Sequence, residues 1–104
     1  MDEQRLLEQL KGRNEIALEE AVSVYEAYIS AIVFRIIGSA MAREDLQEVV
    51  NDTFYSLWVN AERIDLDKGS LRAYLAAIAR NKAKINSGSI RRRRFLSRRR
   101  IRWK

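Results

Sequence analysis

Hydrophobic positions recur along the chain every three or four residues, which is the spacing of amphipathic helices. The first such segment predicts a short helix from about Glu3 to Lys11 that ends at Gly12. Asn14 follows and carries the side-chain oxygen that an N-cap needs, so we expect a second helix from there to Gly38. Its apolar stripe widens toward Gly38, which predicts burial on most sides of its C-terminal half. The stripe consists of Leu18, Ala21, Val22, Tyr25, Tyr28, Ile29, Ile32, Val33 and Ile36.

Two further helices follow from the same pattern. The third is expected from about Ala42 to Glu62, and the fourth after a loop, where Ser70 is a suitable N-cap. The Asn86–Ser89 segment is expected to break the fourth helix. These elements predict an all-α fold, a small three- to four-helix bundle over residues 1–88, with a basic C-terminal tail, residues 89–104, that is too poor in apolar residues to fold alone. The inward-facing positions are Leu46, Val49, Val50, Phe54, Leu57 and Trp58 in the third helix and Leu71, Tyr74, Leu75, Ile78 and Ala79 in the fourth.

Composition excludes several kinds of chemistry. The 104 residues include no Cys and no His, which excludes disulfides, thiolate nucleophiles, imidazole bases and the usual zinc sites. The sequence has no Gly-rich phosphate loop and no nucleophile–base pair, so we expect no enzyme, no catalytic residue, no metal and no cofactor. No apolar run is long enough for a membrane span and no signal peptide opens the chain, so a cytoplasmic protein without membrane insertion is expected.

The net charge of +6 conceals a gradient along the chain. Residues 1–62 have 5 basic and 12 acidic side chains, whereas residues 63–90 have 6 basic and 2 acidic ones. Residues 91–104 add 9 basic side chains and no acidic one. A protein that coats nucleic acid along its whole surface would be basic throughout and would not be divided in this way. The pattern therefore favours two surfaces with different partners.

Four blocks of sequence occur in a distinctive order. Tyr25–Tyr28 and Arg35–Gly38 lie in the second predicted helix, Glu48–Trp58 in the third, and Gly69–Asn81 at the start of the fourth. Over about residues 15–86 the chain resembles region 2 of bacterial sigma factors, specifically the extracytoplasmic function (ECF) class of the sigma-70 family. The resemblance implies a transcription initiation factor that binds the clamp helices of the largest RNA polymerase core subunit and that recognises and opens the −10 promoter element. An anti-sigma factor is a further expected partner.

The expected polymerase surface lies on one face of the third helix. Glu48, Asn51, Asp52 and Tyr55 are three and four residues apart, and Gln47 and Glu44 extend the patch. Such a face can meet basic side chains of a partner coiled coil. The alternative is an ordinary solvated helix face. Phe54 and Trp58 are expected to be core residues, because they share the apolar side.

The expected promoter surface comprises the loop before the fourth helix and that helix itself. In the family, this loop holds a flipped base of the non-template strand. Gly69 and Ser70 offer backbone donors, and Asn81 is the candidate for reading a base. Tyr74 is expected in the core, and the alternative is that it borders the melted strand. The candidates for phosphate contacts are Lys68, Arg72, Arg80, Lys82 and Lys84.

The chain also departs from the family pattern. Full-length members carry a second, helix-turn-helix domain (region 4) that is missing here, so the sequence indicates either a shortened chain or a one-domain member. The Arg-rich tail either contacts DNA or is a linker remnant. Two other functions stay open: a basic helical module that binds nucleic acid, such as RNA, and a module that binds core polymerase or an anti-sigma factor without promoter selectivity.

Overall fold

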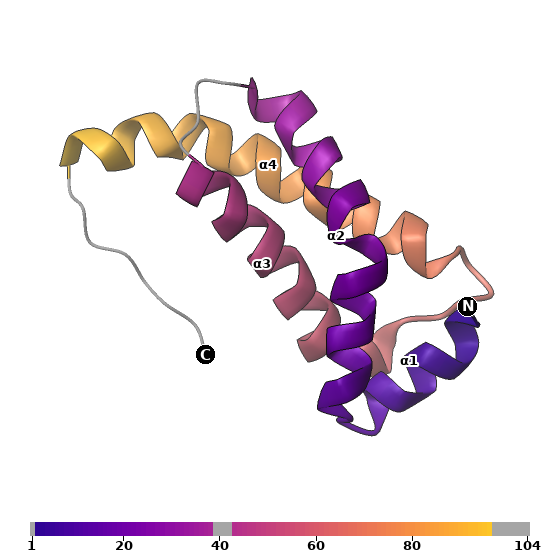
Figure 1. The fold of residues 1–104 in the computed structure, drawn as a ribbon. Coiled ribbons are helices and arrows are strands. Elements are labelled where there is room, and N and C mark those ends of the chain that lie inside the picture. The colour runs from indigo at the N-terminus through magenta and orange to yellow at the C-terminus, as the bar shows by residue number, and fades with distance from the viewer. Residues whose placement is uncertain (1, 39–42, 97–104) are drawn as a thin grey trace.

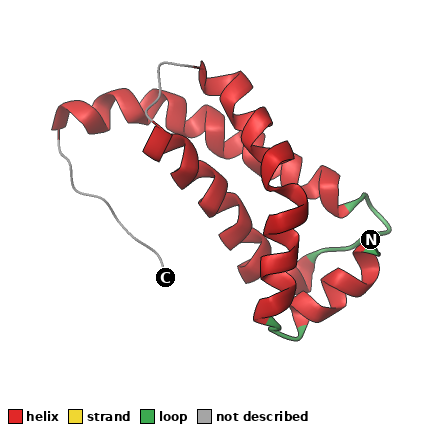
Figure 2. Ribbon diagram, in the orientation of Figure 1, coloured by secondary structure: helices red, strands yellow, loops and turns green. Residues whose placement is uncertain are grey.

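The structure is a computed structural model that describes the backbone of residues 2–38 and 43–96 and the side chains as far as Ile85. The described chain consists of helices joined by short loops (Figures 1 and 2), which confirms the all-α prediction. The helices are α1 (Glu3–Lys11), α2 (Glu15–Ile37), α3 (Arg43–Asn60), the short 3₁₀ helix η2 (Ala61–Arg63) and α4 (Leu71–Leu96).

The three long helices α2, α3 and α4 pack on one another, and α1 packs against α2 and η2 at one end of this bundle (Figure 1). Leu6, Leu7 and Leu10 of α1 are almost completely buried, so this short helix is part of the common core. Burying such side chains stabilises the fold by about 1.5–3 kcal/mol each. The other buried apolar residues are Ala17, Ala21, Tyr25, Ile29, Ile32, Val33, Val49, Val50, Phe54, Leu57, Ala61, Ile64, Leu71, Leu75, Ala76, Ala79 and Ala83.

Side chains at the helix starts accept hydrogen bonds from backbone N–H groups that lack an intrahelical partner. Asn14 Oδ1 accepts from the N–H of Ile16 at 2.9 Å. Ser70 Oγ accepts from the N–H of Ala73 at 3.0 Å. Both predicted caps are therefore confirmed. Asp2, which the sequence analysis did not single out, caps α1 in the same way.

The C-terminal half of α2 is less buried than its sequence indicates. Ile36 and Ile37 are half-buried, and Phe34 is 54% exposed. The prediction of burial on most sides is wrong because α3 and α4 both pack against the face of α2 that carries Ile29 and Val33.

The predicted break in the last helix is also wrong. Helix α4 continues through Asn86–Ser89 and ends at Leu96. One glycine inside a helix costs only about 1 kcal/mol relative to alanine, and the arginines that follow are good helix formers. The division of the chain at residue 88 therefore falls inside a helix, and residues 97–104 of the Arg-rich tail lie outside the described part. Helix α3 ends at Asn60, two residues earlier than predicted, and η2 continues from it.

Candidate functional site

Hydrogen bonds within the loop between η2 and α4 hold the start and the middle of the loop in one conformation. Ile64 is buried, and its N–H donates to the carbonyl of Ala61 at 3.2 Å. The Asp65 carboxylate accepts from the N–H of Asp67 at 2.9 Å, and the Asp65 carbonyl accepts from the N–H of Lys68 at 3.0 Å. Such a turn is typical of aspartate. Ser70 then begins α4, so the loop presents Lys68, Gly69 and Ser70 at the surface.

A hollow of about 380 Å³ lies between this loop and the first turns of α4. Three of the predicted DNA-binding residues, Lys68, Gly69 and Ser70, line it together with Tyr74. Tyr74 is half-buried and packs against the core, as predicted, and it also forms part of the wall. Burial raises the pKa of its hydroxyl above the ordinary value. The hollow therefore combines apolar surface with two cations, Lys68 and Arg63, and one carboxylate, that of Asp65. Apolar surface beside cations suits a flat heteroaromatic group next to a phosphate.

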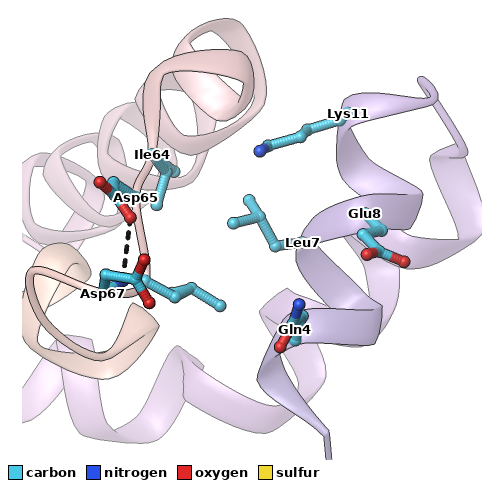
Figure 3. Close-up of a pocket in the computed structure, with 8 residues that line it drawn as sticks. Gln4, Leu7, Glu8, Lys11, Ile64, Asp65 and Asp67 are labelled. Atoms are coloured by element: carbon cyan, nitrogen blue, oxygen red, sulfur yellow. Dashed lines mark hydrogen bonds between the residues drawn. The ribbon is translucent and has the colours of Figure 1, made fainter.

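A second hollow, of about 310 Å³, lies where the same loop faces α1 (Figure 3). Asp65 and Asp67 stand on the loop side, and Glu8 and Lys11 on the α1 side. Its charged lining is mainly acidic, in contrast to the first hollow. This second hollow could not be predicted from the sequence, because residues so far apart in the chain meet only through the packing of α1.

A carboxylate from α1 holds the start of α4, and the sequence analysis missed this contact. Glu3 Oε1 accepts from the N–H of Leu71 at 3.0 Å, and Oε2 accepts from the N–H of Arg72 at 3.3 Å. The Tyr25 hydroxyl of α2 donates to Oε2 at 2.8 Å.

These contacts shift the pKa values of both side chains. Burial raises the pKa of the Glu3 carboxyl, but the hydrogen bonds from Leu71, Tyr25 and Arg72 and the charge of Arg72 outweigh it, so the pKa lies below its usual value. Burial, followed by the hydrogen bond to Glu3, raises the pKa of the Tyr25 hydroxyl well above its usual value.

Arg72, a predicted phosphate contact, has a partner within the protein. Its guanidinium lies over the ring of Tyr28, 4.0 Å from the centroid. This cation–π contact and the nearby Glu3 carboxylate restrict the side chain, although Arg72 remains exposed. Lys68 is exposed at the hollow, so it is the better placed of the two to meet a phosphate beside a bound base.

The remaining predicted DNA-binding residues lie farther along α4. Arg80, Asn81 and Lys84 are exposed, and Lys82 is half-buried. Asn81 is eleven residues beyond Ser70, or about 16 Å along the helix axis, and it does not line the hollow. The structure therefore does not bring the candidate base-reading residue into the hollow. Lys68, Gly69 and Ser70 line the hollow, whereas the exposed Arg80, Asn81 and Lys84 share one side of α4 and form a polar, basic stripe. Arg72 and Lys82 belong to neither group.

The predicted polymerase face is present on α3. Gln47, Asn51 and Tyr55 are exposed, and the Gln47 amide donates to Asn51 Oδ1 at 3.1 Å, one turn along the helix. Glu48 and Asp52 on the same face are half-buried. The sequence analysis missed Val59, which follows Tyr55 by one turn and is 46% exposed. This face of α3 therefore carries polar side chains first and then, toward the C-terminal end of the helix, the exposed Tyr55 and Val59.

Phe54 and Trp58 of α3 pack toward the core, as predicted. Phe54 is buried, and Trp58 is half-buried against the core. The described residues contain no group of three or more His, Cys, Asp or Glu side chains that could hold a metal ion. Among these residues no helix has the length and apolar character that a membrane crossing requires.

Comparison with known families identifies the family of the chain. The family model described as Sigma-70 region 2 matches residues 21–101. The chain belongs to the sigma-70 region 2 family. No curated protein and no solved structure matches it. The match spans most of α2, all of α3 and the whole of α4, and leaves α1 outside.

Sigma-70 region 2 domains take part in transcription initiation, and in general they bind core RNA polymerase and recognise the −10 promoter element. The family is one of transcription factor domains and not a known enzyme family. In this sigma-70 region 2 domain the matched segment contains both the α3 face and the loop with its hollow. It also extends beyond residue 86, where the resemblance recognised from sequence ended.

Proposed function

We propose that this sigma-70 region 2 domain is of the ECF class, that it binds the polymerase clamp helices through α3, and that it holds and helps to melt the non-template strand of the −10 element with the loop and α4. The observation that supports this most directly is the hollow of about 380 Å³ lined by Lys68, Gly69 and Ser70. The sequence motif independently predicts Gly69 and Ser70 as backbone donors of the base-holding loop and Lys68 as a phosphate contact.

The lining of the hollow suits a base that has left its stack. Ile64, Ala73 and the Tyr74 ring supply apolar surface, and Ser70 and Asp65 supply polar groups. Extrusion of a base costs a few kcal/mol, which contacts in a pocket must offset. Lys68 in the lining is placed to meet the adjacent phosphate, and the exposed Arg80 and Lys84 farther along α4 are candidates for contacts with further phosphates of the strand.

The α3 face supports the second half of the proposal. It offers carboxylate and amide groups at helical spacing, followed by the exposed Tyr55 and Val59. A partner coiled coil with basic side chains matches the polar part, and the apolar end can form the buried centre of an interface. Action on RNA polymerase implies a cytoplasmic protein. An anti-sigma factor as a further partner stays a prediction.

The decisive experiment fills the hollow without changing its charge. Ala73 lines the hollow and is exposed, so Ala73→Phe blocks it, whereas Ala77→Phe adds the same ring one turn farther along α4, outside the hollow. Binding of a labelled −10 single strand and of a scrambled strand is measured by fluorescence anisotropy for each variant. We expect Ala73→Phe to lose the preference for the −10 strand and Ala77→Phe to keep it.

Other outcomes point to the other functions. Equal binding of the −10 strand, scrambled strands and duplex RNA by the unaltered chain would indicate a general nucleic-acid module. Binding of core polymerase without any preference for the −10 strand would indicate an interaction module without promoter selectivity. An undiminished preference in Ala73→Phe would contradict the role of the hollow.

A further inference from the structure

We infer that Glu3 is a positioning residue for the promoter-binding loop, and that α1 is therefore part of the promoter-binding unit although it lies outside the matched segment. The inference rests on the proposed function of the loop. It rests structurally on the contact between the first turn of α1 and the first turn of α4, which are 68 residues apart in the chain at Glu3 and Leu71.

The contact satisfies backbone groups that the helix itself leaves without partners. The first N–H groups of any α-helix have no carbonyl within the helix to bond to. In α4, Glu3 accepts from Leu71 and Arg72, and Ser70 accepts from Ala73. Two of these three acceptor oxygens thus belong to Glu3 of α1. Hydrogen bonds from backbone N–H groups to a carboxylate are among the stronger ones in proteins, and the helix dipole adds to them.

The Glu3 carboxylate is itself held in place from two other directions. The Tyr25 hydroxyl of α2 donates to it at 2.8 Å, and the buried leucines of α1 fix the helix that carries it. The side chain of Glu3 is only partly exposed. The Glu3 carboxylate of α1 therefore contacts both α2 and α4, and it holds the N-terminal turn of α4 in one position.

The same turn forms one wall of the hollow. Leu71 follows directly after Gly69 and Ser70, and Ala73 and Tyr74 come within one turn of it; all four of these neighbours line the hollow. A displacement of this turn would change the shape of the hollow. The charge of Glu3 also acts on Arg72, whose guanidinium lies over Tyr28, so loss of the carboxylate would loosen this side chain as well.

A second consequence concerns where phosphates bind. The start of a helix attracts anions because its N–H groups point outward. In α4 the protein's own carboxylate already takes the N–H groups of Leu71 and Arg72. A strand phosphate is therefore expected beside Lys68 rather than at the helix start.

The test compares Glu3→Ala, Glu3→Gln and the control Glu19→Gln in the full chain. Glu19 is an exposed glutamate on α2, so this control removes one charge elsewhere. Glu3→Gln keeps an acceptor oxygen and the side-chain size, which provides a conservative variant if Glu3→Ala does not fold. Amide exchange at Leu71 and Arg72 and the backbone chemical shifts of residues 64–70 are measured by NMR without DNA, and the affinities for the −10 strand and for core polymerase are measured separately.

We expect amide exchange at Leu71 and Arg72 to become about tenfold faster in Glu3→Ala and less so in Glu3→Gln. The loop shifts should change, and the −10 strand affinity should fall about tenfold while the affinity for core polymerase stays within about twofold. A merely structural role would lower both affinities together or neither, and either result would overturn the inference. Unchanged exchange at Leu71 and Arg72 would also overturn it.

Failure of the proposed function would look different. If the unaltered chain shows no preference for the −10 strand, the proposed function is contradicted whatever Glu3 does. The DNA-free measurements then decide the positioning role: changed loop shifts in Glu3→Ala but not in Glu19→Gln support it, and unchanged shifts overturn it.

Discussion

Arg13 and Trp58 join the turn between α1 and α2 to the end of α3. The guanidinium of Arg13 lies 5.1 Å from the centroid of the Trp58 ring, and its Nη1 donates to the Trp58 carbonyl at 2.6 Å. Trp58 belongs to the last turn of α3, where carbonyl groups lack intrahelical partners and a positive charge is favourable. Arg13 itself has a φ of 62°, which is uncommon for a residue other than glycine.

The first prediction concerns Arg13, whose contacts with Trp58 stabilise the fold whereas its positive φ is unfavourable. Arg13→Ala removes the contacts with Trp58 but keeps the unfavourable φ, and should lower the free energy of unfolding by about 1 kcal/mol. Arg13→Gly removes the same contacts and relieves the backbone, so it should be more stable than Arg13→Ala by up to about 1 kcal/mol. Urea denaturation followed by circular dichroism measures both. The contacts are unimportant if Arg13→Ala is as stable as the unaltered chain.

The second prediction concerns acid stability and Glu3. The pKa of Glu3 is lowered in the folded chain, so its contribution to stability is complete above its ordinary value of 4.5 and is lost as the pH falls through the folded pKa. Glu3→Gln should therefore lower the melting temperature at neutral pH and have a smaller effect well below pH 4.5. Thermal melts across this range check the effect, with Glu19→Gln as control. An equal loss at all pH values would exclude a role for the charge.

The third prediction concerns alkaline stability and Tyr25. The pKa of its hydroxyl is raised in the folded chain, so the unfolded chain loses this proton first, near its ordinary value of 10.0. The contribution of Tyr25 to stability is thus complete below pH 10.0 and declines above it. Tyr25→Phe should make the unfolding free energy less dependent on pH in this alkaline range. Urea denaturation at several alkaline pH values measures this dependence, and an unchanged dependence in Tyr25→Phe would contradict the role of the Tyr25 hydroxyl.

The fourth prediction tests the α3 face. Asn51 is exposed at its centre, and Asn51→Lys places a positive charge where a basic partner surface is expected. The affinity for core polymerase should fall about tenfold, because like charges across an interface repel. Glu19→Lys, which adds a positive charge on an exposed site of α2, should have little effect. Equal losses in both variants would show that net charge, and not this face, decides the affinity.

The fifth prediction concerns the basic stripe on α4. If Lys84 contacts a phosphate of the strand, Lys84→Ala should reduce the salt dependence of −10 strand binding by about 0.7 in the slope of log affinity against log salt concentration. The control is Arg35→Ala, because Arg35 is an exposed cation on α2 that does not line the hollow and is not among the candidate phosphate contacts. Anisotropy titrations at several salt concentrations measure the slope. An unchanged slope in Lys84→Ala would remove this residue from the candidate phosphate contacts.

Local sequence is enough to predict the helices, most of their boundaries and the caps at Asn14 and Ser70, because these depend on residues within a turn or two of each other. It also placed Gln47, Asn51 and Tyr55 on one exposed face, and it assigned Lys68, Gly69 and Ser70 to a common site. It wrongly ended the last helix near Gly88, because a local breaker signal is weak when its neighbours favour a helix.

Which side chains meet across the bundle depends on how the helices pack, and local sequence does not show this. The contacts of Glu3 with Leu71 and of Arg13 with Trp58 join residues 68 and 45 positions apart. Periodicity shows which face of a helix is apolar, but it does not show how two helices cross, and the crossing decides which side chains come within hydrogen-bonding distance. For the same reason the sequence does not show that Arg72, a predicted phosphate contact, lies over the ring of Tyr28. Nor does it show that Asn81 lies away from the hollow.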